Sequence, residues 1–195
     1  MTAMLLDEVM ATSDVSEAAH TIVHADRSTT FGLARELDFL RVRTPLLVSA
    51  MWVRGLPAKL THRADDVPPT LVLTEETMPG WLLLGERADE EIAFGAVGVF
   101  WHPQIEWHHV ARDDFAEFAE PGFGKIACNF SCRDYGDGAT LLSYECRTTT
   151  TDAASRAAFA RYWRVVRPFV AHIMRATVAT VRDDAESSLR VRDGA

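Results

Sequence analysis

The sequence predicts a single α+β domain, in which a curved antiparallel sheet is closed by one long C-terminal helix. Between residues 80 and 150, short runs of alternating apolar and polar residues are separated by turns, as is typical of antiparallel strands. From residue 151 to about 184, apolar residues recur every three or four positions, which is the period of a helix. With 195 residues, the chain has the length of one domain with a sizeable core. We expect that domain at residues 15–185, between flexible tails at 1–14 and 186–195.

The first half of the domain is expected to contain one strand and two short helices. Residues 16–24 are predicted to form the strand. Asp26 is a plausible N-cap for a helix that ends near Asp38. A second helix is predicted over 45–56, because Pro45 lies at its start and Gly55 near its end. Two helices in succession after one opening strand do not make a βαβ unit.

The middle of the chain is predicted to supply the other strands. Residues 81–86 and 91–101 form two of them, residues 102–110 give no clear pattern, and one short helical turn is expected over 113–118. The clearest hairpin joins 124–133 to 140–150. Its register is well specified, because a slip of one residue would turn three polar side chains into the core. These three are Asn129, Glu145 and Arg147.

The last element is predicted to be a helix that starts at Thr151 or Asp152 and runs to about Asp184. Pro168 lies inside it, where a proline removes one backbone hydrogen bond and favours a kink. A kinked helix can follow a curved sheet. Its apolar stripe consists of Phe159, Trp163, Val166, Val170, Ile173, Thr177 and Val181.

Composition and motifs exclude several classes of function. A net charge of −8 argues against a nucleic-acid partner, which needs clustered Lys and Arg. Neither a signal peptide nor an apolar stretch long enough for a membrane helix is found, so we expect no membrane insertion and a cytoplasmic location. Gly122 and Gly124 fit a loose dinucleotide pattern, but a strand follows them where a helix is required. No P-loop or nucleophile elbow occurs, and we expect no cofactor.

Cysteine and histidine spacings do not match a known metal site. Cys128, Cys132 and Cys146 are expected to be buried thiols. His102, His108 and His109, with Glu106 between them, form a cluster of imidazoles without a recognised spacing of ligands. Surface or packing roles are the first interpretation of this cluster, with metal binding or acid–base chemistry as the alternative. We predict no metal site.

Several short motifs are similar to one protein superfamily over residues 15–180. They are Asn129-Phe130, Gly138-Ala139-Thr140-Leu141, Tyr144-Glu145-Cys146-Arg147, Thr151-Asp152 and Arg161-Tyr162-Trp163. Together with the order of elements, they resemble an uncharacterised bacterial branch of the START-related, polyketide-cyclase-like (SRPBCC) superfamily. The resemblance implies a helix-grip fold with a cavity between the sheet and the long helix. Members include lipid and sterol carriers, hormone receptors, and cyclases or dehydratases that act on aromatic polyketides.

Apolar side chains on the strands and helices are the candidates for lining such a cavity, although simple core packing is the alternative. The candidates are Met51, Trp81, Phe94, Trp101, Phe130, Tyr144, Tyr162 and Trp163.

Four polar residues of the hairpin, Lys125, Asn129, Glu145 and Arg147, share the opposite face from Phe130. We expect this face to be a solvent-exposed ladder of polar pairs. If it instead faced the cavity, Glu145 and Arg147 would be weak candidates for catalysis, as general acid and electrostatic stabiliser.

Both faces of the strand at 92–100 are apolar, although a sheet with one wet face alternates more cleanly. A cover over the second face is therefore expected, either from residues 102–120 or from a second subunit in a homodimer.

The functional expectation is the binding of a small apolar molecule of lipid, isoprenoid or aromatic polyketide type between the sheet and the C-terminal helix. One alternative is an enzyme of cyclase or dehydratase type that acts on such a ligand. The other is a non-catalytic interaction module. The sequence does not decide whether the chain is an enzyme.

Overall fold

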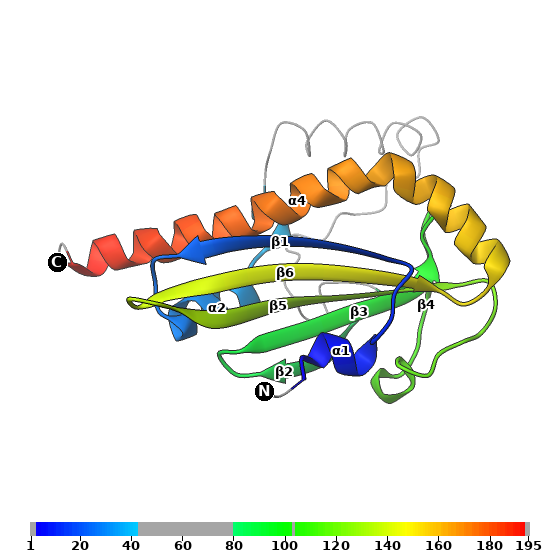
Figure 1. The fold of residues 1–195 in the computed structure, drawn as a ribbon, viewed down its shortest axis with the longest axis horizontal. Coiled ribbons are helices and arrows are strands. Elements are labelled where there is room, and N and C mark those ends of the chain that lie inside the picture. The colour runs from blue at the N-terminus through cyan, green and yellow to red at the C-terminus, as the bar shows by residue number, and fades with distance from the viewer. Residues whose placement is uncertain (1–2, 43–79, 103, 194–195) are drawn as a thin grey trace.

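The predicted fold class is confirmed: six antiparallel strands form an open, curved sheet with a long C-terminal helix, the helix-grip arrangement (Figure 1). The structure is a computed structural model, and it describes residues 3–42, 80–102 and 104–193. The second predicted helix (45–56) and the candidate Met51 lie outside the described residues. The strands are β1 Val15–Val23, β2 Trp81–Arg87, β3 Glu91–Val99, β4 Glu106–His108, β5 Gly124–Gly136 and β6 Ala139–Thr150. The helices are α1 Leu5–Val9, α2 Arg27–Arg35 and α4 Ala153–Asp193, with 3₁₀ turns at Phe39–Arg41 and Arg112–Asp114.

The sheet has the strand order β1-β6-β5-β3-β2, and the short strand β4 pairs with β3. The hairpin of β5 and β6 has the register that the sequence predicts, because Phe130 lies opposite Tyr144 and Asn129 lies opposite Glu145. β4 lies in the stretch that gave no clear pattern. The β5–β6 turn is tight, and Asp137 and Gly138 both have positive φ angles, of 49° and 72°.

One face of the sheet packs against α2 and α4, and we call it the helix face. The core on this side is built from buried residues of four strands and of both helices. They include Ala19, Val23, Phe31, Ala34, Ile92, Phe94, Phe130, Leu142, Met174, Val178 and Val181. Hydrophobic burial of this size is the main contribution to the stability of such a domain.

The opposite face, which we call the outer face, is covered by α1 and by the chain around Phe115. Leu6 and Phe115 are both fully buried there, against Ala93 and Ala127 of the sheet. The expected cover from residues 102–120 is therefore present. The helix α1 was not predicted, because it is one turn long and lies in the segment expected to be a tail. The domain boundaries themselves stay a prediction.

The expectation of a solvent-exposed polar ladder on this face is wrong. Asn129 is fully buried and Lys125 is 8% exposed, because α1 and the chain at 112–118 lie over them. The alternation of β5 predicts which residues share this face, but it does not show that the cover expected over the strand at 92–100 also extends over the polar side of β5.

The long helix α4 begins where the sequence predicts and extends further. The Asp152 carboxylate caps it by accepting hydrogen bonds from the N–H groups of Ala154 (2.8 Å) and Ser155 (2.9 Å). The helix continues to Asp193, beyond the expected end near Asp184. Pro168 lies inside it, and Figure 1 shows that its gold first part and its orange remainder run in different directions. Within the described ranges, no helix is long and apolar enough to cross a membrane.

Candidate functional site

The helix face is organised in rows that run across the strands, because directly paired residues of a sheet point to the same side. The first row crosses β2, β3, β5 and β6 at Ile126, near the start of β5. Each following row lies two residues further along β5, at Cys128 and then at Phe130. The first row contains Trp81, Ala96, Ile126 and Thr148. The second contains Leu83, Phe94, Cys128 and Cys146. The third contains Ile92, Phe130, Tyr144 and Ala19.

Four of the predicted lining residues form one aromatic cluster on these rows. The ring centroids of Phe130 and Tyr144 are 4.5 Å apart, and those of Phe94 and Phe130 are 6.0 Å apart. Trp81 joins the cluster at 5.6 Å from Phe94. Phe39 was not among the lining residues expected from the sequence. It lies in a 3₁₀ turn, and its ring contacts those of Phe94 and Phe130.

The other three described candidates meet at the first turns of α4. Phe159 lies between them, with its ring 6.2 Å from Trp101, 6.1 Å from Tyr162 and 5.8 Å from Trp163. Trp101 also lies beside Gly124, at the start of β5. The structure therefore brings the predicted lining residues together in two groups, one on the sheet and one under the start of the long helix.

The position of α4 over the rows follows from two contacts. Phe159 contacts Trp101 at the Gly124 end of the sheet. Two turns later, the Nε of Arg167 donates to Glu17 Oε2 at 2.9 Å, and Glu17 lies in the second row. Trp163 lies midway between Phe159 and Arg167 along the helix, and its ring stacks on that of Phe159.

In the first two rows of the helix face, half-buried apolar side chains lie among fully buried residues, whereas the third row is buried throughout. On β5, Ile126 is half-buried, whereas Cys128 and Phe130 are 1% and 0% exposed. On β6, Cys146 is half-buried, whereas Leu142 is fully buried. Trp81, Leu83, Tyr162 and Trp163 are also half-buried. Apolar side chains thus retain exposed surface where the first part of α4 crosses the sheet, and close packing begins beyond it.

The polar groups on this face are few. Burial raises the pKa of the Tyr144 phenol well above its ordinary value, so this hydroxyl stays protonated and acts as a hydrogen-bond donor rather than as a base. The Glu17 carboxylate, whose side chain is 14% exposed, pairs with Arg167 at the β1 side of the face. An apolar surface with a few fixed polar groups is typical of small-molecule sites.

The two weak candidates for catalysis lie on the outer face. Arg147 Nε donates to Glu145 Oε1 at 2.7 Å, and its Nη1 pairs with Asp7 at 2.8 Å and donates to the Met10 carbonyl at 2.9 Å. Asp7 belongs to α1, and Met10 is the residue that follows this helix. The pair therefore holds α1 on the sheet, and it does not share a face with the aromatic cluster.

Two buried polar residues beside this pair, Glu91 and Lys125, also bind the segments that cover the outer face. Glu91 accepts hydrogen bonds from the backbone N–H groups of Leu5 (2.7 Å) and Leu6 (3.2 Å) and from Asn129 Nδ2 (2.6 Å). Lys125 Nζ donates to the carbonyls of Phe115 and Ala116, and burial lowers its pKa. We interpret both as structural anchors.

Two histidines near β4, His102 and His108, each lie beside a carboxylate. His102 Nδ1 lies 2.9 Å from Glu106, and His108 Nε2 lies 3.8 Å from Glu120. Among the described residues, no three His, Cys, Asp or Glu side chains are grouped so that they could hold a metal ion.

Sequence reasoning missed Leu83, Ile126 and Cys146, which supply the half-buried apolar surface beside Trp81. The alternation of β5 and β6 places the last two on the correct face. No signal in the sequence distinguishes them from the fully buried Cys128 and Phe130, because the difference depends on where α4 crosses the sheet.

The chain was compared with protein families, curated proteins and solved structures. No family model matches it, and no curated protein matches it. Among solved structures, it is similar to the hypothetical protein jhp0584 from Helicobacter pylori, at 10% identity and a TM-score of 0.46, over 95% of this chain and 97% of that chain. TTHA0849 from Thermus thermophilus matches at 9% identity and a TM-score of 0.35, over 89% of this chain and 99% of that chain. CalU16 from Micromonospora echinospora matches at 9% identity and a TM-score of 0.30, over 89% of this chain and 84% of that chain.

Proposed function

We propose that the protein binds a small apolar molecule on the helix face, where the first part of α4 crosses the sheet. The observation that carries this proposal is a set of half-buried apolar side chains in the first two rows, beside a third row that is buried throughout; the set is Trp81, Leu83, Ile126 and Cys146. Trp163, which is also half-buried, lies in the first part of α4. A lipid, isoprenoid or aromatic polyketide would cover these side chains.

The chemistry of the surface supports an apolar ligand over a charged one. Its walls are two indoles, a phenol and aliphatic side chains, whose transfer out of water is favourable by about 25 cal/mol for each Å² of apolar surface that a ligand covers. The carboxylate of Glu17 is already paired with Arg167. Tyr144 Oη is held protonated by burial. The motifs that resemble the START-related superfamily agree with this proposal.

The same geometry gives no support for catalysis on this face. A general acid or base must lie within hydrogen-bond reach of the reacting group. Glu145 and Arg147 lie on the other side of the sheet, in contact with α1. The proposal is therefore binding, without an assigned reaction.

Extraction of the purified protein with organic solvent, followed by mass spectrometry, tests the proposal. We expect an apolar compound in stoichiometric amount from the wild type and a large loss of it from Ile126→Trp, because the larger side chain fills the first row. Val165→Trp is the matched control, since Val165 is 68% exposed on the same helix as Trp163. Absence of any apolar compound, together with no binding of a neutral naphthylamine dye, would contradict the proposal.

A further inference from the structure

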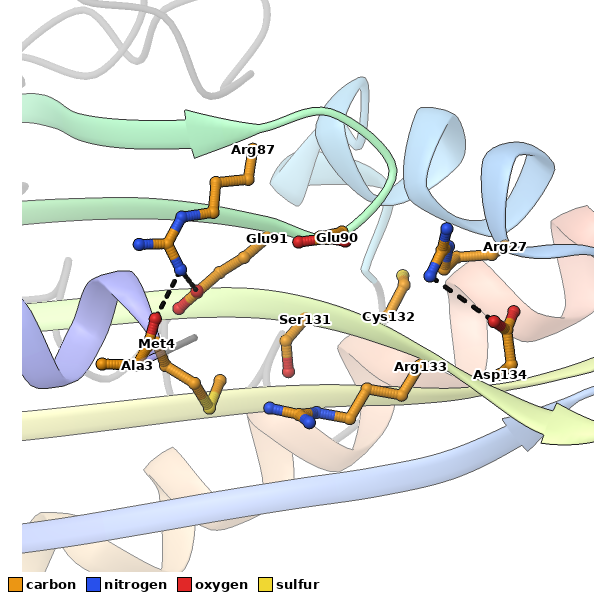
Figure 2. Close-up of a pocket in the computed structure, with 10 residues that line it drawn as sticks. All are labelled: Ala3, Met4, Arg27, Arg87, Glu90, Glu91, Ser131, Cys132, Arg133 and Asp134. Atoms are coloured by element: carbon orange, nitrogen blue, oxygen red, sulfur yellow. Dashed lines mark hydrogen bonds and ion pairs between the residues drawn. The ribbon is translucent and has the colours of Figure 1, made fainter. Parts of the chain in front are cut away.

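A second, polar pocket lies at the other end of the sheet, where β5 runs past the turn between β2 and β3 (Figure 2). Its volume is about 430 Å³, and the start of α2 and the residues before α1 complete its walls. The lining residues are Ala3, Met4, Arg27, Arg87, Glu90, Glu91, Ser131, Cys132, Arg133 and Asp134. Four residues of β5 lie between Ile126 and Ser131, so this pocket is separate from the proposed apolar site.

Two of the charged residues in its wall are engaged in holding α1. Arg87 pairs with Glu8 at 2.7 Å and lies 3.9 Å from Glu91, and it also donates to the Ala3 carbonyl. The Glu91 oxygens accept the first N–H groups of α1. These two residues build the wall, and their charges are compensated within the protein.

Arg133 is different, because its guanidinium has no ion pair or hydrogen bond to any residue that the structure describes. Figure 2 shows it reaching under Ser131, with the Ser131 hydroxyl directed toward it. Ser131 is 5% exposed, and within the described segments its hydroxyl has no hydrogen-bond partner. Ser131 lines the pocket, so its hydroxyl can donate a hydrogen bond to a ligand atom there.

The open edge of β5 adds a backbone donor on the same side. The Cys132 N–H donates to the Glu90 carbonyl at 2.8 Å, and β3 does not extend beyond this point. Alternate residues of a strand direct their N–H groups to the same neighbour, so the Asp134 N–H is directed to the open edge. Arg27 adds a second guanidinium, whose Nη1 lies 3.5 Å from the exposed Asp134 carboxylate.

We propose that this pocket binds the anionic group of a small molecule, a carboxylate or a phosphate, through Arg133 and Ser131. A guanidinium donates hydrogen bonds in a fork that matches the oxygens of either group. Glu90 lies on the other side of Ser131 in Figure 2, where its carboxylate repels a second anionic group. The pocket therefore selects compounds with one anionic end.

Titration of the ¹⁵N-labelled protein with inorganic phosphate and, separately, with acetate tests this site by NMR. We expect saturable shifts of the backbone amides at 131–134 with at least one of the two anions, and the stronger binder identifies the source of the group. Arg133→Gln should raise the Kd about tenfold or more, since it removes a charged hydrogen-bond donor. Ser131→Ala should raise it by a smaller factor, and Glu90→Gln should lower it.

Arg175→Gln is the matched control, because Arg175 is an exposed arginine of α4 outside the pocket. Its Kd should stay within about twofold of the wild-type value, as expected for a distant surface residue. Non-saturable shifts, equal weakening by Arg133→Gln and Arg175→Gln, or unchanged affinity in Arg133→Gln would overturn the proposal. The amide spectrum of each variant shows directly whether it is folded.

Discussion

At the scale of single residues, the side chains on the two sides of β5 have different structural roles. Along β5, Ile126, Cys128 and Phe130 face the helix side, whereas Lys125 and Asn129 anchor the cover of the outer face. Asn129 Nδ2 has its partner in β3, and Lys125 Nζ has its partners in the chain near Phe115. Asn129 Oδ1 is the exception among the described residues, because no hydrogen bond satisfies it.

Replacement of Phe130 by alanine tests the core assigned to the helix face. Phe130 is fully buried and contacts Phe39, Phe94 and Tyr144. We expect the free energy of unfolding to fall by about 3–5 kcal/mol, as for other buried phenylalanines. Urea denaturation measures this change. Tyr135→Ala on the same strand is the control, since Tyr135 is 57% exposed and its loss should change the stability by less than about 0.5 kcal/mol.

At the scale of elements, the shortest and the longest helices have different sources of stability. α1 has five residues, too few for a helix that is stable alone, so it depends on burial of Leu6 and on the Glu91 carboxylate at its N-terminus. α4 has 41 residues and begins at a well-formed cap. The first is fixed by tertiary contacts, and the second is predicted by its own sequence.

Leu6→Ala tests the role of α1 as the cover of the outer face. Because Leu6 is fully buried, its truncation should destabilise the protein by about 2–5 kcal/mol. We also expect faster hydrogen exchange at the amides of α1. Val9→Ala is the control, because Val9 is half-buried and should cost less than half as much. Equal effects of the two substitutions would contradict the assignment.

The cap of α4 gives a prediction about pH. The hydroxyl and N–H of Ser155 and the N–H of Gly122 bind the Asp152 carboxylate and lower its pKa from 3.8 to about 2. A pKa that is lower in the folded state adds stability above the unfolded pKa, and this contribution is lost as the pH falls from about 4 to about 2. The stability difference between wild type and Asp152→Ala should therefore be largest near neutral pH and shrink over this interval.

Urea unfolding at several pH values measures that difference. Asp113→Ala replaces an exposed carboxylate away from the cap and serves as the control. A difference for Asp152→Ala that stays constant from pH 6 to pH 2 would show that the hydrogen bonds of the carboxylate do not contribute.

At the scale of the whole molecule, the sheet has two covered faces and two candidate sites. The long helix covers the helix face and leaves apolar surface at one end, under its first turns. The polar pocket lies at the opposite end, where β5 has no neighbour on one side. The distance along β5 allows each site to be tested without disturbing the other.

Apart from α1 and β4, the sequence predicts the order of the described helices and strands and the hairpin register, because alternation and helical period are local properties. It also places Trp81, Phe94, Phe130 and Tyr144 on one face. It does not predict α1, since a single turn gives no periodic signal. Nor does it predict the burial of Asn129, which results from contacts with residues far away in the chain. The polar pocket was missed for the same reason, because its walls come from four separate segments.

Methyl NMR shows directly whether an apolar ligand binds where the first part of α4 crosses the sheet. The protein, labelled at its Ile, Leu and Val methyl groups, is titrated with a neutral naphthylamine dye. We expect saturable shifts and ligand contacts at Ile126 and Leu83, with little change at Leu84, which is 5% exposed on the outer face. Larger changes at Leu84 than at Ile126, or no saturable binding, would contradict this expectation.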